Sequence, residues 1–196
     1  MEQTKERIIK SAIKLFAEKG FHETKVEDIA LESVVAKGTV YLYFKSKEEI
    51  MDTCLEFIFS EALKNYEIPD ELNFSDSIRM VVEKNFKFVD ENIDFYRMLS
   101  KGIYSTSKDA KMGRRDCERE LFEKATSSME KIILKGINEG KIKKEVYPKH
   151  LAVTFINTII SSLTIVVNSK IKGFELNENE YKEEIINFLT GGIYEK

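Results

Sequence analysis

The chain has 196 residues, of which 42% are hydrophobic and 33% are charged, and its formal net charge is −3. This is the composition of an ordinary soluble globular protein, long enough to bury a core in one large domain or two small ones. Two prolines and nine glycines are too few for a turn-rich β fold, and they favour long helices.

The sequence also argues against secretion, a membrane span and a metal site. The first ten residues are polar and lack the apolar core of a secretory signal, so we expect a cytoplasmic protein. The most apolar run, 151–167, is interrupted by six Thr, Ser or Asn residues, which suits a buried helix better than a membrane helix. Cys54 and Cys117 lack metal-ligand spacing and are expected to be plain thiols, and we expect no metal or cofactor.

Charge is unevenly distributed along the chain. Residues 1–47 contain nine Lys or Arg and seven Asp or Glu, a net charge of +2, so the remainder carries −5. The overall charge alone would argue against nucleic acid as a partner. A mildly basic N-terminal part on an acidic body is nevertheless compatible with DNA binding at one end.

The first helix is predicted by apolar residues at helical spacing between Ile8 and Phe16. Gly20 is expected to follow its end in the left-handed conformation, so the last helical residue lies near Lys19. Phe21 can then fold back onto Phe16, the hydrophobic contact that accompanies such an end.

Two short helices are predicted next. Thr24 and Glu27 have the spacing of a capping box, which would open the first of them. A break at 33–36 separates it from the second, at 37–44.

A second capping box, formed by Ser46 and Glu49, opens a long helix that extends to about Tyr66. Two short helices that are separated by a turn of three to four residues, and supported by a third helix, describe a helix-turn-helix unit.

Helical patterns continue after a linker near Pro69, without β-like alternation or internal repeats. Pro148 stands at a plausible first-turn position of one of these helices. The patterns cover residues 75–92, 94–105, 109–139, 148–171 and 178–194. The sequence therefore predicts an all-α chain of about nine helices. It has a small head, 1–47, and a larger body, 48–196, which begins with a connecting helix at 48–66.

Two segments, Leu15–Phe21 (LFAEKGF) and Lys37–Glu49 (KGTVYLYFKSKEE), resemble the TetR family of bacterial transcriptional regulators, and the similarity covers residues 5–55. Lys135–Ile142 (KGINEGKI) is similar to the segment that leads into the family's dimerisation helices. The resemblance implies a helix-turn-helix DNA-binding domain in the head and a helical ligand-binding and dimerisation domain in the body.

Chemistry suits the second short helix to base recognition, because the N-terminal residues of a recognition helix lie nearest the base edges of the major groove. Lys37 can donate to guanine O6 or N7, and Gly38 permits close approach to the DNA backbone or a thymine methyl. Thr39 can donate to a phosphate or touch a base. Tyr41 and Tyr43 are two residues apart, so they point in different directions.

Neighbouring residues suit phosphate contacts. Lys47 lies at the start of the following helix, and Thr24 and Lys25 lie at the N-terminus of the preceding one, where free amides favour anions. The resemblance assigns Lys37, Thr39 and Tyr41 to bases, and Thr24, Tyr43 and Lys47 to the DNA backbone. The predicted DNA-binding set is Thr24, Lys25, Lys37, Gly38, Thr39, Tyr41, Tyr43 and Lys47. The alternative is that Tyr43 is a core aromatic, as we expect for Phe44, and that the lysines form a solvated face.

Two residues depart from the family pattern. Many members have Gly where this chain has Val34, and Ser where it has Ala36. A β-branched residue is poorly suited to positive φ, and the loss of a capping side chain costs about 1 kcal/mol. We therefore expect a distorted turn, or a head that is loosely ordered without DNA.

The resemblance also implies a ligand cavity inside the middle helices of the body. The candidate lining residues are aromatic residues, methionines and one amide: Phe86, Tyr96, Met98, Tyr104, Phe122, Met129, Phe155 and Asn157. Together they favour an apolar or aromatic small molecule, although each also fits a plain core position.

A homodimer would present two such heads to half-sites about 34–36 Å apart on double-stranded DNA. Apolar stripes at helical spacing lie on the last two helices. The candidate interface residues are Ile159, Ser162, Leu163, Val166, Ile185, Leu189 and Ile193. The alternative is that these stripes pack only within the monomer.

Three functions are compared. The first is a ligand-responsive repressor that binds a palindromic operator as a dimer and is released by an apolar or aromatic small molecule. The second is a TetR-like helical interaction or sensor protein with weakened or lost operator binding, motivated by Val34 and Ala36. The third is a small helical enzyme, against which His22 and His150, the only histidines, stand without a nucleophile or metal partner.

Overall fold

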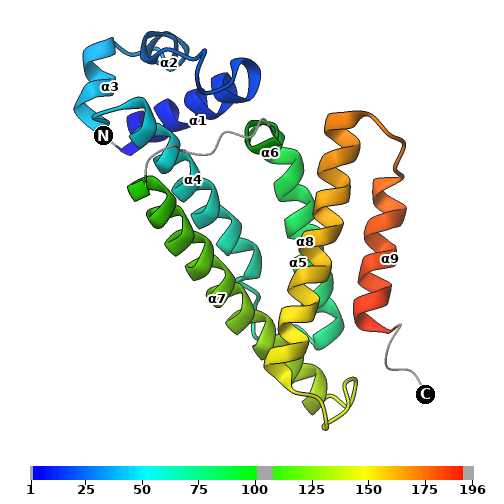
Figure 1. The fold of residues 1–196 in the computed structure, drawn as a ribbon. Coiled ribbons are helices and arrows are strands. Elements are labelled where there is room, and N and C mark those ends of the chain that lie inside the picture. The colour runs from blue at the N-terminus through cyan, green and yellow to red at the C-terminus, as the bar shows by residue number, and fades with distance from the viewer. Residues whose placement is uncertain (1, 101–107, 192–196) are drawn as a thin grey trace. The chain divides into compact units, whose positions relative to one another are not determined.

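The computed structural model describes residues 2–100 and 108–191, and side chains of the helix that begins at Lys108 are described from Arg119 onward. This part of the chain contains nine α-helices, one 3₁₀ helix and no strand, which confirms the predicted fold class (Figure 1). The α-helices are α1 (Glu2–Lys19), α2 (Val26–Glu32), α3 (Lys37–Tyr43), α4 (Lys47–Leu63), α5 (Phe74–Glu91), α6 (Ile93–Ser100), α7 (Lys108–Asn138), α8 (Pro148–Lys172) and α9 (Glu178–Thr190), and the 3₁₀ helix is η1 (Lys64–Tyr66).

The chain divides into two compact units. Unit 1 comprises Met1–Glu61 and Asn92–Arg119, and unit 2 comprises Ala62–Glu91 and Glu120–Lys196. Unit 1 therefore contains α1 to α3, nearly all of α4, α6 and the start of α7, whereas the sequence divided the chain after residue 47. That earlier boundary separates functions rather than compact units, and it stays a prediction.

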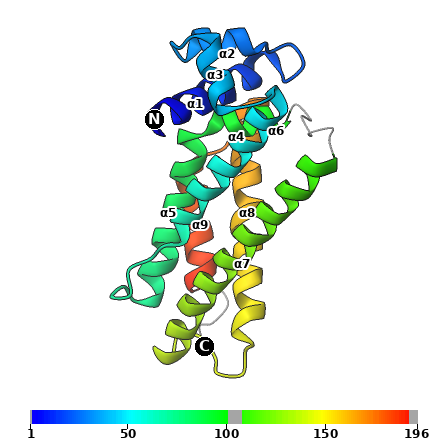
Figure 2. The ribbon, with the colours of Figure 1, turned by 90° about the vertical axis from the view of Figure 1, so that its left-hand side faces the viewer.

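Unit 1 is organised around α1. Its buried stripe includes Ile8, Ala12 and Phe16, all without exposed surface, and the helix packs against α2 and α6. Figure 2 shows α1, α2 and α3 gathered together. The helix ends as predicted: Gly20 has φ +86° and donates its N–H to the Phe16 carbonyl at 3.0 Å. The rings of Phe16 and Phe21 lie 5.5 Å apart between centroids.

The start of α4 is also capped by its own sequence. Ser46 Oγ accepts from the N–H of Glu49 at 3.2 Å, as the capping box requires. The Glu49 carboxylate accepts from the N–H of Lys45 at 2.6 Å rather than from Ser46. The predicted box is thus confirmed on one side and displaced by one residue on the other.

Unit 2 is built on three helices, α5, α8 and α9, which contact one another (Figure 1). Arg79 on α5 donates to both carboxylate oxygens of Glu183 on α9, at 2.8 and 3.0 Å. Lys170 near the end of α8 pairs with Asp90 on α5 at 2.8 Å and with Glu178 on α9 at 2.5 Å. These ion pairs lie at the rim of an apolar interior.

The segment KGINEGKI (135–142) packs the end of α7 against the start of α5. A Cβ atom on Gly136 would lie 2.8 Å from the ring of Phe74 and 2.9 Å from the side chain of Ile142. Lys135 donates to two backbone carbonyls of the segment that precedes α5. The Glu139 carboxylate accepts from the N–H of Phe74 at 3.0–3.1 Å. This segment is therefore a packing junction inside unit 2.

Helix α8 is, among the described helices, the one long and apolar enough to cross a membrane by length and composition. The core helix of a soluble protein meets the same criteria, and one face of α8 is buried within unit 2. The described structure thus agrees with the expectation of a buried helix over 151–167.

The apolar stripes proposed for a dimer lie mostly inside the protomer. Buried side chains include all four candidates on α8 and one on α9, namely Ile159, Ser162, Leu163, Val166 and Leu189. They pack in the interior of unit 2, which is the alternative that the sequence left open. Ile185 is half-buried, and Ile193 lies outside the described residues.

Candidate nucleic-acid interface

Helices α2 and α3 are joined by a tight turn at 33–36. Val34 adopts φ +54°, and its side chain is 82% exposed. Its N–H donates to the carbonyl of Leu31 at 3.1 Å, and the N–H of Val35 donates to that of Ala30 at 2.9 Å. These bonds close the turn, so the predicted distortion is not present. Valine instead occupies a left-handed conformation that costs an L-residue about 1–2 kcal/mol.

The start of α3 lacks a side-chain cap, as predicted. Ala36 is the N-cap residue, with φ −69° and ψ 147°, and makes no side-chain hydrogen bond. Together with the turn, this gives a complete helix-turn-helix whose two weak positions are held by backbone hydrogen bonds alone.

Helix α3 has one buried and one open face. Val40 is fully buried and Phe44, which follows the helix, is 2% exposed, so Phe44 is the core residue that the sequence predicted. Lys37, Gly38 and Tyr41 are exposed, whereas Thr39 and Tyr43 are half-buried. A Cβ atom on Gly38 would meet nothing within 4 Å. The open face therefore carries the central part of the predicted DNA-binding set.

Sequence reasoning missed Leu42, which is 83% exposed on this open face. Leu42 lies one helical turn after Gly38 and opposite the buried Val40. Helical periodicity alone could have placed it outward, but an exposed leucine was not considered as a DNA contact. Apolar side chains can contact the methyl group of thymine in the major groove.

Lys37 makes two contacts within the head. Its Nζ donates to Glu27 Oε1 at 2.5 Å and lies 5.8 Å from the centroid of the Tyr41 ring. The hydrogen bond raises the pKa of Lys37 and lowers the pKa of Glu27. Sequence reasoning did not find this pair, because the two residues belong to different helices.

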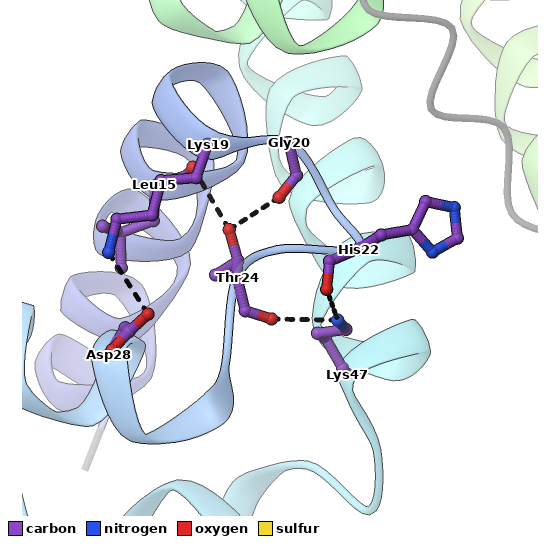
Figure 3. Close-up of polar contacts among 7 residues, drawn as sticks. All are labelled: Leu15, Lys19, Gly20, His22, Thr24, Asp28 and Lys47. Carbon is purple, nitrogen blue, oxygen red and sulfur yellow. Dashed lines mark hydrogen bonds and ion pairs between the residues drawn. The ribbon is translucent and has the colours of Figure 1, made fainter.

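Lys47 is placed differently from the prediction. Its Nζ donates to the carbonyls of Phe21 at 2.7 Å, Thr24 at 2.9 Å and His22 at 3.3 Å, two of which Figure 3 shows. The ammonium also lies 4.5 Å from the centroid of the Phe21 ring. An ammonium has three donors, and all three are engaged here. Lys47 therefore ties the loop between α1 and α2 to the start of α4.

The capping box predicted at Thr24 is wrong. The Thr24 side chain is fully buried, and its hydroxyl donates to the carbonyls of Gly20 at 2.7 Å and Leu15 at 3.2 Å (Figure 3). Lys25, which is exposed, is the N-cap residue of α2 and has no side-chain cap hydrogen bond. The carbonyls at the end of α1 outcompeted the local cap, so the Thr24 hydroxyl faces the interior rather than a phosphate.

The acidic side chains of α2 are paired with lysines of its neighbours. Besides Glu27 with Lys37, Asp28 pairs with Lys19 of α1 at 3.2 Å (Figure 3), and Glu32 pairs with Lys14 of α1 at 2.6 Å. The hydrogen bond from Lys19 lowers the pKa of Asp28. Part of the positive charge of the head is thus neutralised within the head itself.

The residues predicted to line a ligand cavity do not gather in one unit. Tyr96 and Met98 belong to α6 in unit 1, and burial raises the pKa of Tyr96 to about 12. The buried candidates of unit 2 are Phe86, Met129 and Phe155. Phe122 is 39% exposed, Asn157 is exposed on the outer side of α8, and Tyr104 lies outside the described residues. Asn157 therefore has no lining role in this protomer.

Sequence reasoning also missed the polar groups inside unit 2. Thr126 is buried, and its hydroxyl has no hydrogen-bond partner among the described residues. Asn65 and Asn85 are buried as well, and the side-chain amide of Asn65 donates to that of Asn85 at 3.4 Å. Buried polar groups are usually satisfied, so the Thr126 hydroxyl is an exception among the described residues.

No metal centre is indicated where the structure describes side chains, in residues 2–100 and 119–191. Within these ranges no three or more His, Cys, Asp or Glu side chains are grouped so that they could hold a metal ion.

Comparison with known proteins agrees with this geometry. Residues 8–54 match the family model described as bacterial regulatory proteins, tetR family. The fatty acid metabolism regulator protein of Bacillus subtilis (strain 168) is 24% identical over 199 residues, which cover 97% of this chain and 95% of that protein. The biofilm operon icaADBC HTH-type negative transcriptional regulator IcaR of Staphylococcus aureus (strain Newman) is 26% identical over 188 residues, covering 95% and 97%.

A solved structure shares the fold. The transcriptional regulator FadR from Bacillus subtilis, determined in complex with stearoyl-CoA, has a TM-score of 0.74 at 21% identity, covering 96% of this chain and 98% of that one. The turn at 33–36 and the open face of α3 define a helix-turn-helix DNA-binding protein. The N-terminal part of the chain, residues 8–54, therefore carries the helix-turn-helix domain of the TetR family of bacterial regulatory proteins. The predicted family and the predicted class of DNA-binding regulator are thereby confirmed.

Proposed function

We propose that this protein is a cytoplasmic dimeric repressor that binds a palindromic operator through α3 and is released by an apolar small molecule. The observation that carries the proposal is the open face of α3, where Lys37, Gly38, Tyr41 and Leu42 are exposed together. The turn at 33–36 is closed by hydrogen bonds. An intact turn gives less support to the alternative function, an interaction protein that has lost operator binding.

In this proposal the residues of the head have distinct roles. Lys37 donates to guanine, Tyr41 reaches bases or sugar, and Gly38 allows the helix to approach closely. Thr39 faces bases, as the resemblance implies. Tyr43 and Lys25 contact the DNA backbone, which sets register without carrying sequence information. Lys47 and Thr24 act indirectly, because their side chains hold the loop between α1 and α2. Residues 1–47 form the DNA-binding domain, and 48–66 connect it to the body.

The dimer surface is proposed to be the outer side of the last two helices. Ile160 and Ile165 of α8 are 46% and 42% exposed, and Phe188 of α9 is 47% exposed. Large apolar side chains that the protomer leaves uncovered are better candidates for a second copy than the buried stripe. A two-fold dimer supplies the two recognition helices that a palindrome requires.

The effector is proposed to be a molecule with a long apolar part and at least one polar group. The interior of unit 2 offers aromatic and methionine side chains together with the Thr126 hydroxyl, a combination typical of small-molecule sites. A related fold was determined with stearoyl-CoA, so this acyl-CoA is the first probe, with free coenzyme A as its control.

The test is an unbiased selection of duplex DNA by the purified full-length protein at two salt concentrations. We expect a palindrome with half-sites one helical turn apart and binding that weakens steeply as salt rises. Stearoyl-CoA is then expected to lower affinity for the selected duplex, whereas coenzyme A leaves it unchanged. Failure to enrich a palindrome at either salt concentration rules out the proposed operator binding.

A further inference from the structure

The lysine proposed to read guanine is held on two sides in the structure. Glu27, in the first turn of α2, accepts from Lys37 Nζ at 2.5 Å, and the Tyr41 ring lies 5.8 Å from the same nitrogen. Glu27 and Tyr41 belong to the two helices of the helix-turn-helix. The position of the ammonium is therefore set by both helices rather than by the lysine side chain alone.

This ion pair contributes little to folding. The side chains of Lys37 and Glu27 are 51% and 56% exposed, and exposed pairs of this kind typically have small effects on stability. The ion pair instead restricts the conformation of the Lys37 side chain before DNA binds. A free lysine loses considerable rotamer freedom when it is immobilised at an interface. A lysine that is already ordered loses less when it binds DNA.

We propose that Glu27 is a positioning residue for DNA-sequence selectivity, because it fixes the Lys37 ammonium so that its remaining donors meet a guanine edge. The inference rests on the DNA binding proposed above and deepens it. An ammonium has three donors, and the bond to Glu27 leaves two. Guanine presents two acceptors, N7 and O6, to the major groove.

Glu27 also opposes the wrong contact. Without this carboxylate, the flexible Lys37 side chain is free to reach phosphates, which are present at every sequence and confer no selectivity. A negative charge next to the ammonium disfavours phosphate as a partner, so binding to unrelated DNA is weakened more than binding to the operator. The raised pKa of Lys37 agrees with a tight pair in the free protein.

Two substitutions of Glu27 separate its reach from its charge. Glu27→Asp keeps the charge but shortens the side chain by one methylene, so the contact with Lys37 is lost. Glu27→Gln keeps the length and removes the charge. The matched control is Glu23→Gln, which removes a charge from an exposed residue of the same head without touching Lys37. Circular dichroism and thermal unfolding check that each full-length variant is folded.

The readout is the ratio of affinities for two duplexes: the one selected by the wild-type protein, and a scrambled duplex of equal length and composition. Glu27→Asp is expected to lower this ratio about fivefold, the effect of ordering one side chain. Glu27→Gln is expected to lower it by tightening binding to the scrambled duplex. Glu23→Gln should tighten binding to both duplexes equally and leave the ratio unchanged.

A second set of variants carries Lys37→Met. In this background the Glu27 substitutions are expected to leave the ratio unchanged, because Glu27 acts through Lys37. An unchanged ratio in Glu27→Asp, or an effect of Glu27 that persists without Lys37, overturns the inference. Failure of the proposed function is a separate result, since the wild-type protein itself would then prefer no duplex.

Discussion

The same dipeptide, Lys-Gly, begins two segments of this chain and is used in opposite ways. In the head, Lys37 and Gly38 are exposed, and a Cβ atom on Gly38 would lie in open space. In the body, a Cβ atom on Gly136 would lie 2.8 Å from the Phe74 ring, and Lys135 is bonded to two backbone carbonyls. One glycine leaves room for a partner, and the other leaves room for the protein's own core.

The difference shows that a sequence motif alone does not reveal whether its residues are exposed to a partner or packed inside the protein. Both segments resemble a regulator family in their letters, yet packing decides their roles. The body segment contacts residues 63 to 65 positions earlier in the chain. The head segment leaves one face exposed to solvent, because only its opposite face, with Val40, packs into the core. A family motif that is exposed indicates a binding site, and one that is buried indicates a contribution to folding.

The largest effect is expected from replacing the two glycines by alanine. Gly136→Ala introduces a methyl group at less than 3 Å from Phe74 and Ile142, and such overpacking should lower the free energy of unfolding by about 2 kcal/mol. Gly38→Ala should raise it by about 0.5 kcal/mol, because alanine favours the helix and nothing is displaced. Urea unfolding of both variants measures the two effects.

Binding should reverse this order. Gly38→Ala is expected to weaken binding to the selected duplex, because the added methyl group stands between α3 and the DNA, whereas folded Gly136→Ala should keep the affinity of the wild-type head. If both variants lose the same stability and the same affinity, the contrast between the two segments is not real.

The lysines of the two dipeptides give the next largest effect. Lys135→Met removes donors from two carbonyls and should lower the free energy of unfolding by about 1.5 kcal/mol, as expected for a charged hydrogen bond. Lys37→Met removes only an exposed ion pair, so stability should change by less than about 0.5 kcal/mol. Its affinity for the selected duplex should fall about tenfold.

The control is binding to the scrambled duplex, for which Lys37→Met should lose much less affinity than for the selected one. A loss of stability in Lys37→Met as large as that in Lys135→Met would contradict the comparison. Chemical unfolding and fluorescence anisotropy on the same preparations provide both values.

Much of the fold could be predicted because its signals are local. The helix end at Gly20 and the helix start at Pro148 depend on conformations that single residues favour, and both were placed correctly. The hydrogen bonds of the Thr24 side chain could not be predicted. Its hydroxyl can either cap α2 or donate to the carbonyls of Leu15 and Gly20. Local spacing does not reveal which of two hydrogen bonds the folded chain makes.

The site was predicted in part, for a similar reason. The open face of α3 followed from resemblance and periodicity, but the pair of Glu27 with Lys37 joins two helices across a turn. Lys47 was expected at a phosphate and instead donates to three carbonyls. In α8, apolar residues occur on more than one side, so periodicity did not distinguish the interior from a dimer surface.

A smaller effect is expected at the turn of the head, where conformation rather than packing sets the cost. Val34 is exposed and has φ +54°, a conformation that asparagine tolerates better than a β-branched residue. Val34→Asn should therefore raise the free energy of unfolding by about 1 kcal/mol. Val35→Asn, at the next position of the same turn, is the control and should give no gain. An unchanged stability in Val34→Asn would show that the turn carries no strain.

The smallest effect concerns a single methyl group at the exposed end of the comparison. If Leu42 contacts a thymine methyl, replacing that thymine by uracil in the selected duplex should cost about 0.8 kcal/mol, the contribution of one buried methyl-sized group. This is about a fourfold rise in Kd. Leu42→Ala should bind the thymine duplex with a similar loss, and should no longer distinguish thymine from uracil. Because uracil differs from thymine only by the methyl group, equal discrimination by the wild-type protein and Leu42→Ala would assign the methyl contact to another residue. If the losses from Leu42→Ala and from uracil add when both changes are combined, the Leu42 side chain and the thymine methyl do not contact each other. If the combined loss equals either single loss, the open face of α3 reads DNA through Leu42.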